Sequence, residues 1–251
     1  MTRSGVVIRS RLLRWGPGAV DLVMDSAGSG PSVVLLPALS SISTRGEMKP
    51  LLERLAKDFK VTSVDWPGFG DLPRPPTDWT PDTLSAFLNW FLQHIPGPHI
   101  VVAAGHAAAY ALRQAAENPS TIDRLILIAP TWRGPLPTMM GGHRPWFDRV
   151  RAAIDNPLFG RALYRLNVSR PVIKMMAREH VYTDPAWLSN QRLATKLAVT
   201  QAPGARHASA RFVTGALDRF SSRETFLDQA RRVRMPILVV YGNETPRKSR
   251  A

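Results

Sequence analysis

Apolar residues in the first half of the chain form short continuous runs that alternate with longer amphipathic stretches. The runs predict strands and the stretches predict helices, an alternation typical of an α/β protein with a mostly parallel sheet. After a hairpin of residues 5–14 and 19–25, strands are expected at residues 32–36, 60–65, 99–104 and 122–129. Helices are expected at residues 47–58, 81–94 and 107–117.

The sheet pattern stops after Pro130 and returns only at residues 236–241. The intervening stretch has helical patterns, loops and many arginine and aromatic residues, but no convincing strand. We therefore expect an α/β core made of residues 1–130 and 235–251, interrupted by a helical cap at residues 131–234.

Charge is distributed unevenly between these parts. The 251-residue chain has a net charge of +14, with 12 basic and 11 acidic residues in positions 1–130 but 21 and 8 in positions 131–251. Arginine supplies 27 of the 33 basic side chains, and its guanidinium group suits carboxylates and phosphates. A basic cap of this kind predicts an anionic membrane surface or an acidic partner, although a solvated face explains the charge equally well. No nucleic-acid motif accompanies it.

Several classes of site are excluded by composition. The chain has no cysteine, which rules out disulfides, thiolate zinc sites, iron–sulfur clusters and cysteine nucleophiles. It contains no run of about 18 apolar residues, and residues 1–10 lack the apolar core of a secretory signal. We expect a soluble cytoplasmic protein without a metal or other cofactor, and peripheral membrane association is the alternative location.

Motifs along the chain occur in a recognisable order. Asp65-Trp66-Pro67-Gly68-Phe69-Gly70 resembles a D-x-P-G-x-G loop, and Gly105-His106-Ala107-Ala108-Ala109 lies where a G-x-S-x-G nucleophile elbow would be. Residues 122–130 and 239–242 are similar to the strands that precede the cap and deliver the acid. Together these segments resemble the α/β-hydrolase superfamily over most of residues 30–245. The resemblance implies a doubly wound sheet with a helical cap.

The resemblance also implies an eighth strand and a final helix, which this sequence lacks. We therefore expect residues 236–241 to form an exposed sheet edge that a partner could cover. With Pro37-Ala38-Leu39-Ser40 and Ala107 in place of the usual groups, the chain further resembles hydrolase-like proteins of cyanobacteria and plastids.

The elbow carries the central prediction. The resemblance places Ala107 where the family has its serine nucleophile, with small residues Gly105 and Ala109 on either side. A methyl group has no lone pair and no proton to lose, so no acyl-enzyme can form on it. The resemblance assigns the oxyanion-hole donors to the backbone N–H groups of Leu39 and Ala108, with His106 beside the turn.

The other triad positions are also altered. The family's histidine base lies beyond the last strand, and no histidine follows Gly242 in this sequence. The usual acid position is occupied by Thr245, with Glu244 just before it as a substitute acid or an exposed turn residue. Ser41, paired with His106, is the alternative nucleophile.

The entrance to the cap offers apolar and titratable side chains for a ligand. Trp132, Met139, Met140 and His143 are expected at a pocket there, although helix packing or a surface loop explains each equally simply. We expect a non-catalytic or very weakly active pseudo-hydrolase that binds an apolar or amphipathic small molecule or a partner. One alternative is a hydrolase of carboxylic esters or related acyl substrates that uses a non-standard nucleophile, or whose native C-terminus and elbow serine are absent from this sequence. The other is a peripheral membrane-binding protein.

Overall fold

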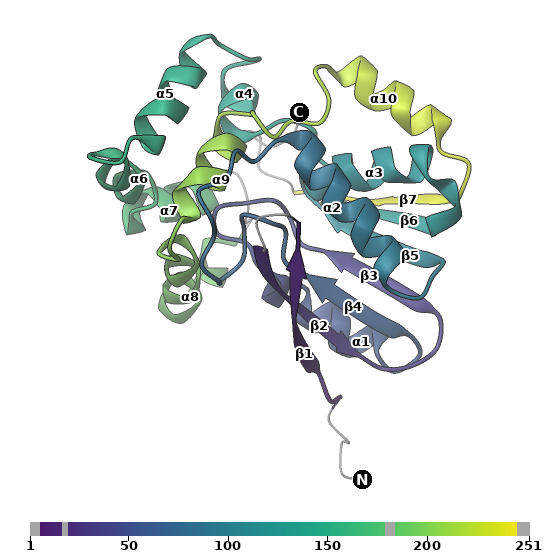
Figure 1. Ribbon diagram of the computed structural model, residues 1–251. Coiled ribbons are helices and arrows are strands. Elements are labelled where there is room, and N and C mark those ends of the chain that lie inside the picture. Colours follow the sequence, from purple (N-terminus) through teal and green to yellow (C-terminus); the bar gives the residue numbers. More distant parts are fainter. Residues whose placement is uncertain (1–5, 17–19, 179–183, 245–251) are drawn as a thin grey trace.

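The computed structural model describes residues 6–16, 20–178 and 184–244 (Figure 1). These residues form a seven-stranded sheet in the order β1-β2-β4-β3-β5-β6-β7. The strands β1 and β2 form an antiparallel hairpin, and β2 is also antiparallel to β4. The other four pairs of neighbouring strands are parallel. The strands are β1 (Arg9–Trp15), β2 (Val20–Ala27), β3 (Ser32–Leu36), β4 (Lys60–Val64), β5 (His99–Ala104), β6 (Ile122–Ile128) and β7 (Ile237–Val240).

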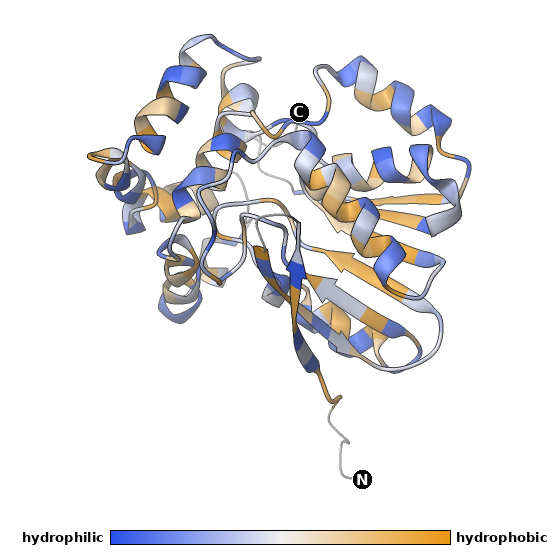
Figure 2. Ribbon diagram, in the orientation of Figure 1, coloured by the Kyte–Doolittle hydropathy of each residue, from blue (hydrophilic) through white to orange (hydrophobic). Residues whose placement is uncertain are grey.

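Helices cover both faces of the sheet, which explains why its central strands are continuous apolar runs. Alternate residues of β3 enter two separate hydrophobic clusters: Val34 and Leu36 join one, Val33 and Leu35 the other. The first cluster contains α2 (Pro81–His94) and α3 (Ala107–Glu117), and the second contains α1 (Lys49–Leu55). Figure 2 shows the apolar strands enclosed between these layers.

Most predicted elements are confirmed, and one differs in a way that its sequence explains. The helix α2 begins after Thr80, whose hydroxyl accepts a hydrogen bond from the Thr83 N–H at 3.1 Å. The helix expected at residues 47–58 is instead a short 3-10 turn, η1 (Arg45–Met48), followed by α1. Pro50 lies in the first turn of α1, where its missing N–H costs no hydrogen bond.

Between β6 and β7 the described chain is helical. It forms α4 (Pro135–Met139), α5 (Trp146–Asp155), α6 (Gly160–Asn167), α7 (Arg170–Met176), η4 (Pro185–Trp187), α8 (Asn190–Thr200), α9 (Ala205–Val213) and α10 (Arg223–Arg232). Residues from α5 to α9 share a hydrophobic cluster of their own, separate from the two clusters of the sheet. The helix α10 lies inside the range expected for the cap but packs on α3 beside the sheet (Figure 1). We propose that the cap ends before α10.

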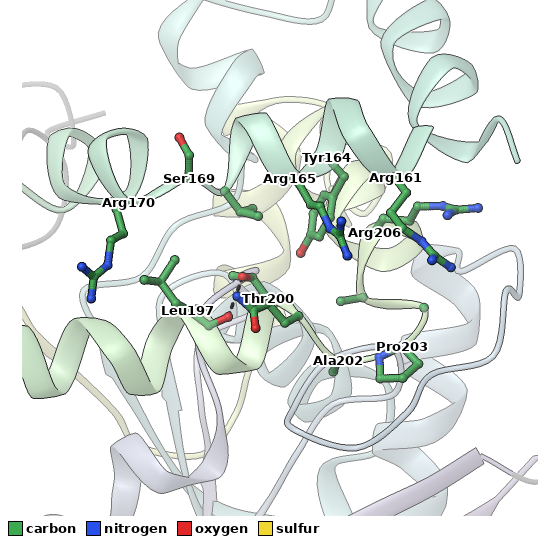
Figure 3. Close-up of a pocket in the computed structure, with 14 residues that line it drawn as sticks. Arg161, Tyr164, Arg165, Ser169, Arg170, Leu197, Thr200, Ala202, Pro203 and Arg206 are labelled. Carbon is green, nitrogen blue, oxygen red and sulfur yellow. Dashed lines mark hydrogen bonds between the residues drawn. The ribbon is translucent and has the colours of Figure 1, made fainter. Parts of the chain in front are cut away.

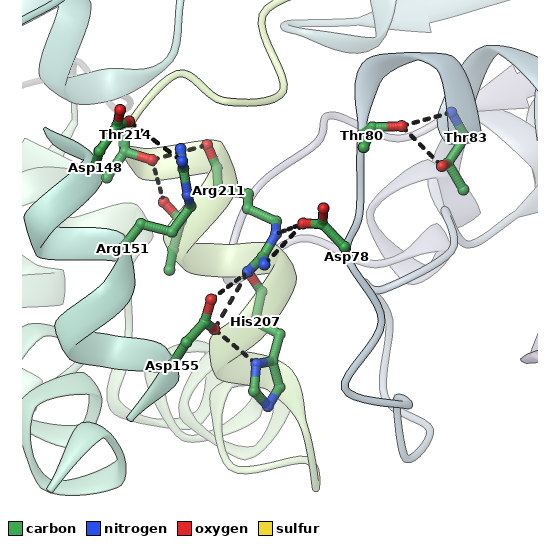
Figure 4. Close-up of polar contacts among 10 residues, drawn as sticks. Asp78, Thr80, Thr83, Asp148, Arg151, Asp155, His207, Arg211 and Thr214 are labelled. Atoms are coloured by element: carbon green, nitrogen blue, oxygen red, sulfur yellow. Dashed lines mark hydrogen bonds and ion pairs between the residues drawn. The ribbon is translucent and has the colours of Figure 1, made fainter. Parts of the chain in front are cut away.

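Polar contacts fasten the cap helices to the core. Lys196 of α8 pairs with Glu47 at 2.5 Å, and Arg211 of α9 pairs with Asp78 at 2.9 Å (Figure 4). The buried side chain of Arg74 donates to the Val199 carbonyl at 3.2 Å, in the last turn of α8. A helix leaves its last carbonyls unpaired, so a guanidinium group stabilises this end of α8.

The strand β7 lies at the edge of the sheet in the described part of the chain. Its residues Ile237–Val240 are all exposed, as expected for an apolar edge without a neighbour beyond it. Thr245 and the basic tail after it lie outside the described residues.

Candidate functional site

The turn between β5 and α3 is centred on Gly105. The strand ends at Ala104, Gly105 has a φ of +53°, and α3 begins at Ala107. The Gly105 N–H donates to the Ile128 carbonyl at 2.9 Å, and the Gly105 carbonyl accepts from the Thr131 N–H at 3.1 Å. Because this φ lies in the left-handed region, glycine is the residue that adopts the turn without strain.

Ala107, the residue expected at the nucleophile position, lies inside the packed protein instead. It is the first residue of α3 and has no exposed surface. Ala108, expected to supply an oxyanion-hole donor, is equally buried, and its N–H donates to the Gly105 carbonyl at 3.2 Å. The accessible residue of this turn is Gly105, which is half-buried.

The loop after β3 faces the turn through Ala38. A Cβ atom added to Gly105 would lie 3.1 Å from the Cβ of Ala38. The Leu39 side chain, by contrast, points into the first hydrophobic cluster, which contains α2 and α3. Ser41 is half-buried, and its hydroxyl makes no hydrogen bond with any other described residue. The loop therefore presents a small apolar side chain, not a hydroxyl, to the turn.

The His106 side chain is buried beneath the turn. Its Nε2 lies 3.1 Å from the Leu217 carbonyl oxygen, which also accepts the Tyr110 hydroxyl at 2.7 Å. Burial lowers the pKa of His106, which favours the neutral imidazole. The imidazole therefore contacts Leu217, and the expected pairing with Ser41 is not formed.

A buried carboxyl group that no sequence motif indicated lies next to this histidine. Asp218 Oδ1 accepts the Gly134 N–H at 2.7 Å and lies 3.6 Å from His106 Nε2, while Oδ2 lies 3.2 Å from His143 Nε2. Burial raises the pKa of Asp218 to about 8, against the opposing effects of the Gly134 N–H and the Arg133 charge. Asp218 is therefore mostly protonated near neutral pH, and its carboxyl can donate a hydrogen bond to His143.

The remaining cap residues expected at a pocket lie at the surface or close to it. His143 is about half exposed, and so are Met139 and Met140. The guanidinium of Arg133 stacks on the Trp132 ring at 4.0 Å. Trp132 and Arg133 lie next to the turn because their neighbours in sequence contact it. The Thr131 N–H donates to the Gly105 carbonyl, and the Gly134 N–H donates to Asp218.

At the end of β7, Glu244 is exposed. The Asp218 carboxyl lies beside two histidines, His106 and His143. In the described part of the chain, no group of three or more histidine, aspartate or glutamate side chains could hold a metal ion. The acid–base chemistry available at this site therefore belongs to Asp218 and His143.

Comparison with known proteins identifies the family. The model of the alpha/beta hydrolase family matches residues 33–245, so the chain belongs to this family, and the predicted α/β-hydrolase fold is confirmed. Residues 6–16, 20–178 and 184–244 contain no helix that is long and apolar enough to cross a membrane.

Solved structures agree with this fold. The epoxide hydrolase CorEH is 19% identical, with a TM-score of 0.66 over 95% of this chain and 83% of that one. The 2-hydroxy-6-oxo-6-phenylhexa-2,4-dienoate hydrolase of Rhodococcus sp. strain RHA1 is 16% identical, with a TM-score of 0.67 over 95% and 82% of the two chains.

One curated relative is matched over part of its length. The pimeloyl-[acyl-carrier protein] methyl ester esterase of Nitrosomonas europaea is 27% identical over 108 residues. The match covers 43% of this chain and 40% of the esterase.

Proposed function

We propose that this alpha/beta hydrolase family member is a non-catalytic or very weakly active protein that binds an apolar or amphipathic small molecule, or a partner. The observation that carries the proposal is the residue at the turn after β5. The family's serine stands at a sharp, strained strand-to-helix turn with its hydroxyl exposed. Here Gly105 has the left-handed φ of +53° and is half-buried, and it has no side chain to attack a substrate.

On this proposal the nucleophile's place is taken by Gly105 and not by Ala107. Small residues are needed two positions before and after the nucleophile, and Ala103 and Ala107 provide them, both fully buried. The oxyanion-hole donor from this turn would then be the N–H of His106, the residue that follows Gly105. Either position lacks a nucleophilic atom, so the proposal of an inactive elbow does not depend on this choice. Losing the serine of a triad lowers turnover by about a millionfold.

The absence of a nucleophile is tested with a fluorophosphonate probe and p-nitrophenyl esters. We expect the purified protein to remain unlabelled and to hydrolyse the esters no faster than a sample unfolded by heat. Saturable hydrolysis that survives Ser41→Ala, or a covalent adduct on any residue, contradicts the proposal. Hydrolysis that Ser41→Ala abolishes supports the non-standard nucleophile instead. Native mass spectrometry of the same sample tests for a bound ligand.

A second candidate function is hydrolysis of carboxylic esters or related acyl substrates. Two observations favour it: the contact between Asp218 and His143, and the name of the partly matched relative, a methyl ester esterase. A histidine oriented by a carboxyl group can act as a general base toward water. If this function is correct, His143→Gln removes ester hydrolysis while Ser41→Ala leaves it unchanged.

A further inference from the structure

A cavity of about 760 Å³ lies among the cap helices, away from the residues of the elbow (Figure 3). Its walls come from α6, the start of α7, the end of α8 and the start of α9. Its volume falls in the range of small-molecule sites. Tyr164, Val168 and Leu197 give part of the wall an apolar character.

Arginine dominates the charged lining of this cavity. Arg161 and Arg165 come from α6, Arg170 from α7 and Arg206 from α9. None of the described residues that line the cavity is acidic. In Figure 3, Arg161, Arg165 and Arg206 lie at one side of the cavity and Arg170 at the other end.

These four guanidinium groups have no partner among the described residues. None makes an ion pair or a side-chain hydrogen bond there, and the Nε of Arg206 is buried without an acceptor. The carboxylate of Asp155, on the neighbouring α5, is already occupied by His207 at 2.7 Å and Arg211 at 2.9 Å (Figure 4). Arg161 and Arg165 are exposed and lie four residues apart on α6, where like charges destabilise a helix slightly and a bound anion would offset the repulsion.

The backbone adds to the positive potential. The helix α9 begins at the cavity wall with Gly204 as its N-cap and has no side-chain cap. The Ala205 and His207 N–H groups donate to the Ala202 and Gly204 carbonyls at 3.0 and 3.2 Å, so the helix dipole, not these N–H groups, faces a ligand. A Cβ on Gly204, whose φ is +77°, would lie 1.8 Å from the Arg74 carbonyl oxygen, which restricts this position to glycine. The positive end of the α9 dipole therefore supplements the arginines.

We propose that this cavity, lined by Arg161, Arg165, Arg170 and Arg206, binds a small molecule with at least two phosphate or carboxylate groups joined to an apolar part. Arginine forks pair with both kinds of group through two parallel hydrogen bonds. Tyr164 and Leu197 would contact the apolar part. The site is separate from the elbow and does not depend on whether the elbow is catalytic.

Isothermal titration calorimetry with inorganic pyrophosphate, phosphate and phenyl phosphate tests the proposal. At about 150 mM NaCl, where exposed charges are screened, we expect one site for pyrophosphate with a dissociation constant below about 1 mM. The double variant Arg161→Gln/Arg165→Gln should weaken binding at least about tenfold. Arg206→Gln, whose side chain reaches the cavity from another helix, should weaken it as well.

The matched control removes the same charge elsewhere. Arg232→Gln/Arg234→Gln changes two exposed arginines, the last residue of α10 and the second residue after it, outside the cavity, and should leave the affinity within about twofold. Equal losses in the two double variants, or no saturable binding of any of the three probes, would overturn the proposal. So would sedimentation with phosphatidylserine vesicles that pyrophosphate does not compete, since the charge would then serve a membrane surface.

Discussion

The sheet and the cap are stabilised in different ways. In the sheet, β3 and β5 are buried on both faces, and the large aromatic side chains of α2 pack beneath them. In the cap, exposed apolar side chains such as Leu158, Phe159 and Leu166 are frequent, and the helices share a smaller cluster. Ion pairs of Lys196, Arg211 and Arg219 with core carboxylates connect the two regions.

The sheet forms the fold shared by the family, whereas the cap is the region that can vary without loss of that fold. Burial of apolar area stabilises a sheet without specifying a ligand, so the family fold does not require a nucleophile at the turn of Gly105. The cap has a smaller core and many unpaired arginines, and these are the features in which a new ligand specificity can arise.

The largest effect is expected from a cavity in the sheet region. Phe87 has no exposed surface, and its ring contacts Trp15 and Trp66 at 5.3 and 6.0 Å between centroids. Phe87→Ala should lower the free energy of unfolding by about 3–5 kcal/mol. Phe159→Ala, at a cap residue that is half exposed, should cost less than about 1 kcal/mol. Chemical denaturation measures both, and equal losses would remove the distinction between the two regions.

A smaller and more local effect is expected where the cap meets the core. Arg211 is buried and pairs with Asp78 and Asp155 (Figure 4). Arg211→Gln should cost about 2 kcal/mol, reduced by the exposure of Asp78. Amide hydrogen exchange should accelerate in α5 and α9 while α2 stays protected. Equal acceleration in α2 would show that the cap and the core open as one unit.

How far the sequence predicts the structure differs between the same two regions. The bounds of α2, α3, β3 and β5 follow from apolar periodicity and from the Thr80-Pro81 start signal, because these are local features. The cluster around Asp218 could not be predicted, since its partners Gly134 and His143 are 84 and 75 residues away. No periodicity records such polar contacts.

The elbow is an intermediate case. Small residues are spaced suitably for a nucleophile position at either Gly105 or Ala107, so the motif alone is ambiguous. The strand predicted at residues 99–104 contained the missing information, because the turn must follow directly after its last residue. The φ of +53° at Gly105 then favours the earlier position.

The raised pKa of Asp218, which lies between the elbow and the cap, predicts that the free energy of unfolding depends on pH. Its pKa of about 8 in the folded protein exceeds the ordinary value of 3.8, so folding favours the neutral acid. This contribution to stability is complete below about pH 4 and is lost as the pH rises to about 8. Asp218→Asn should remove this loss of stability at higher pH, because an amide does not ionise.

Thermal or chemical unfolding at several pH values measures this effect. Relative to the wild type, the stability of Asp218→Asn should rise by at most about 1.4 kcal/mol for each pH unit between 4 and 8. His143→Gln serves as the control, because it keeps the Asp218 carboxyl and should retain the slope. Parallel curves for Asp218→Asn and wild type would show that the carboxyl is ionised in the folded protein.

The most local prediction, and the clearest test of the elbow, uses single cysteines introduced into a chain that has none. Gly105→Cys places a thiol at the half-buried turn and should cost about 1 kcal/mol for the left-handed φ. Ala107→Cys places it inside α3 at a site without exposed surface. A small thiol reagent should modify Cys at 105 readily and at 107 at least about 100-fold more slowly, since the second site reacts only after local opening. Faster modification at 107 would return the nucleophile's place to Ala107.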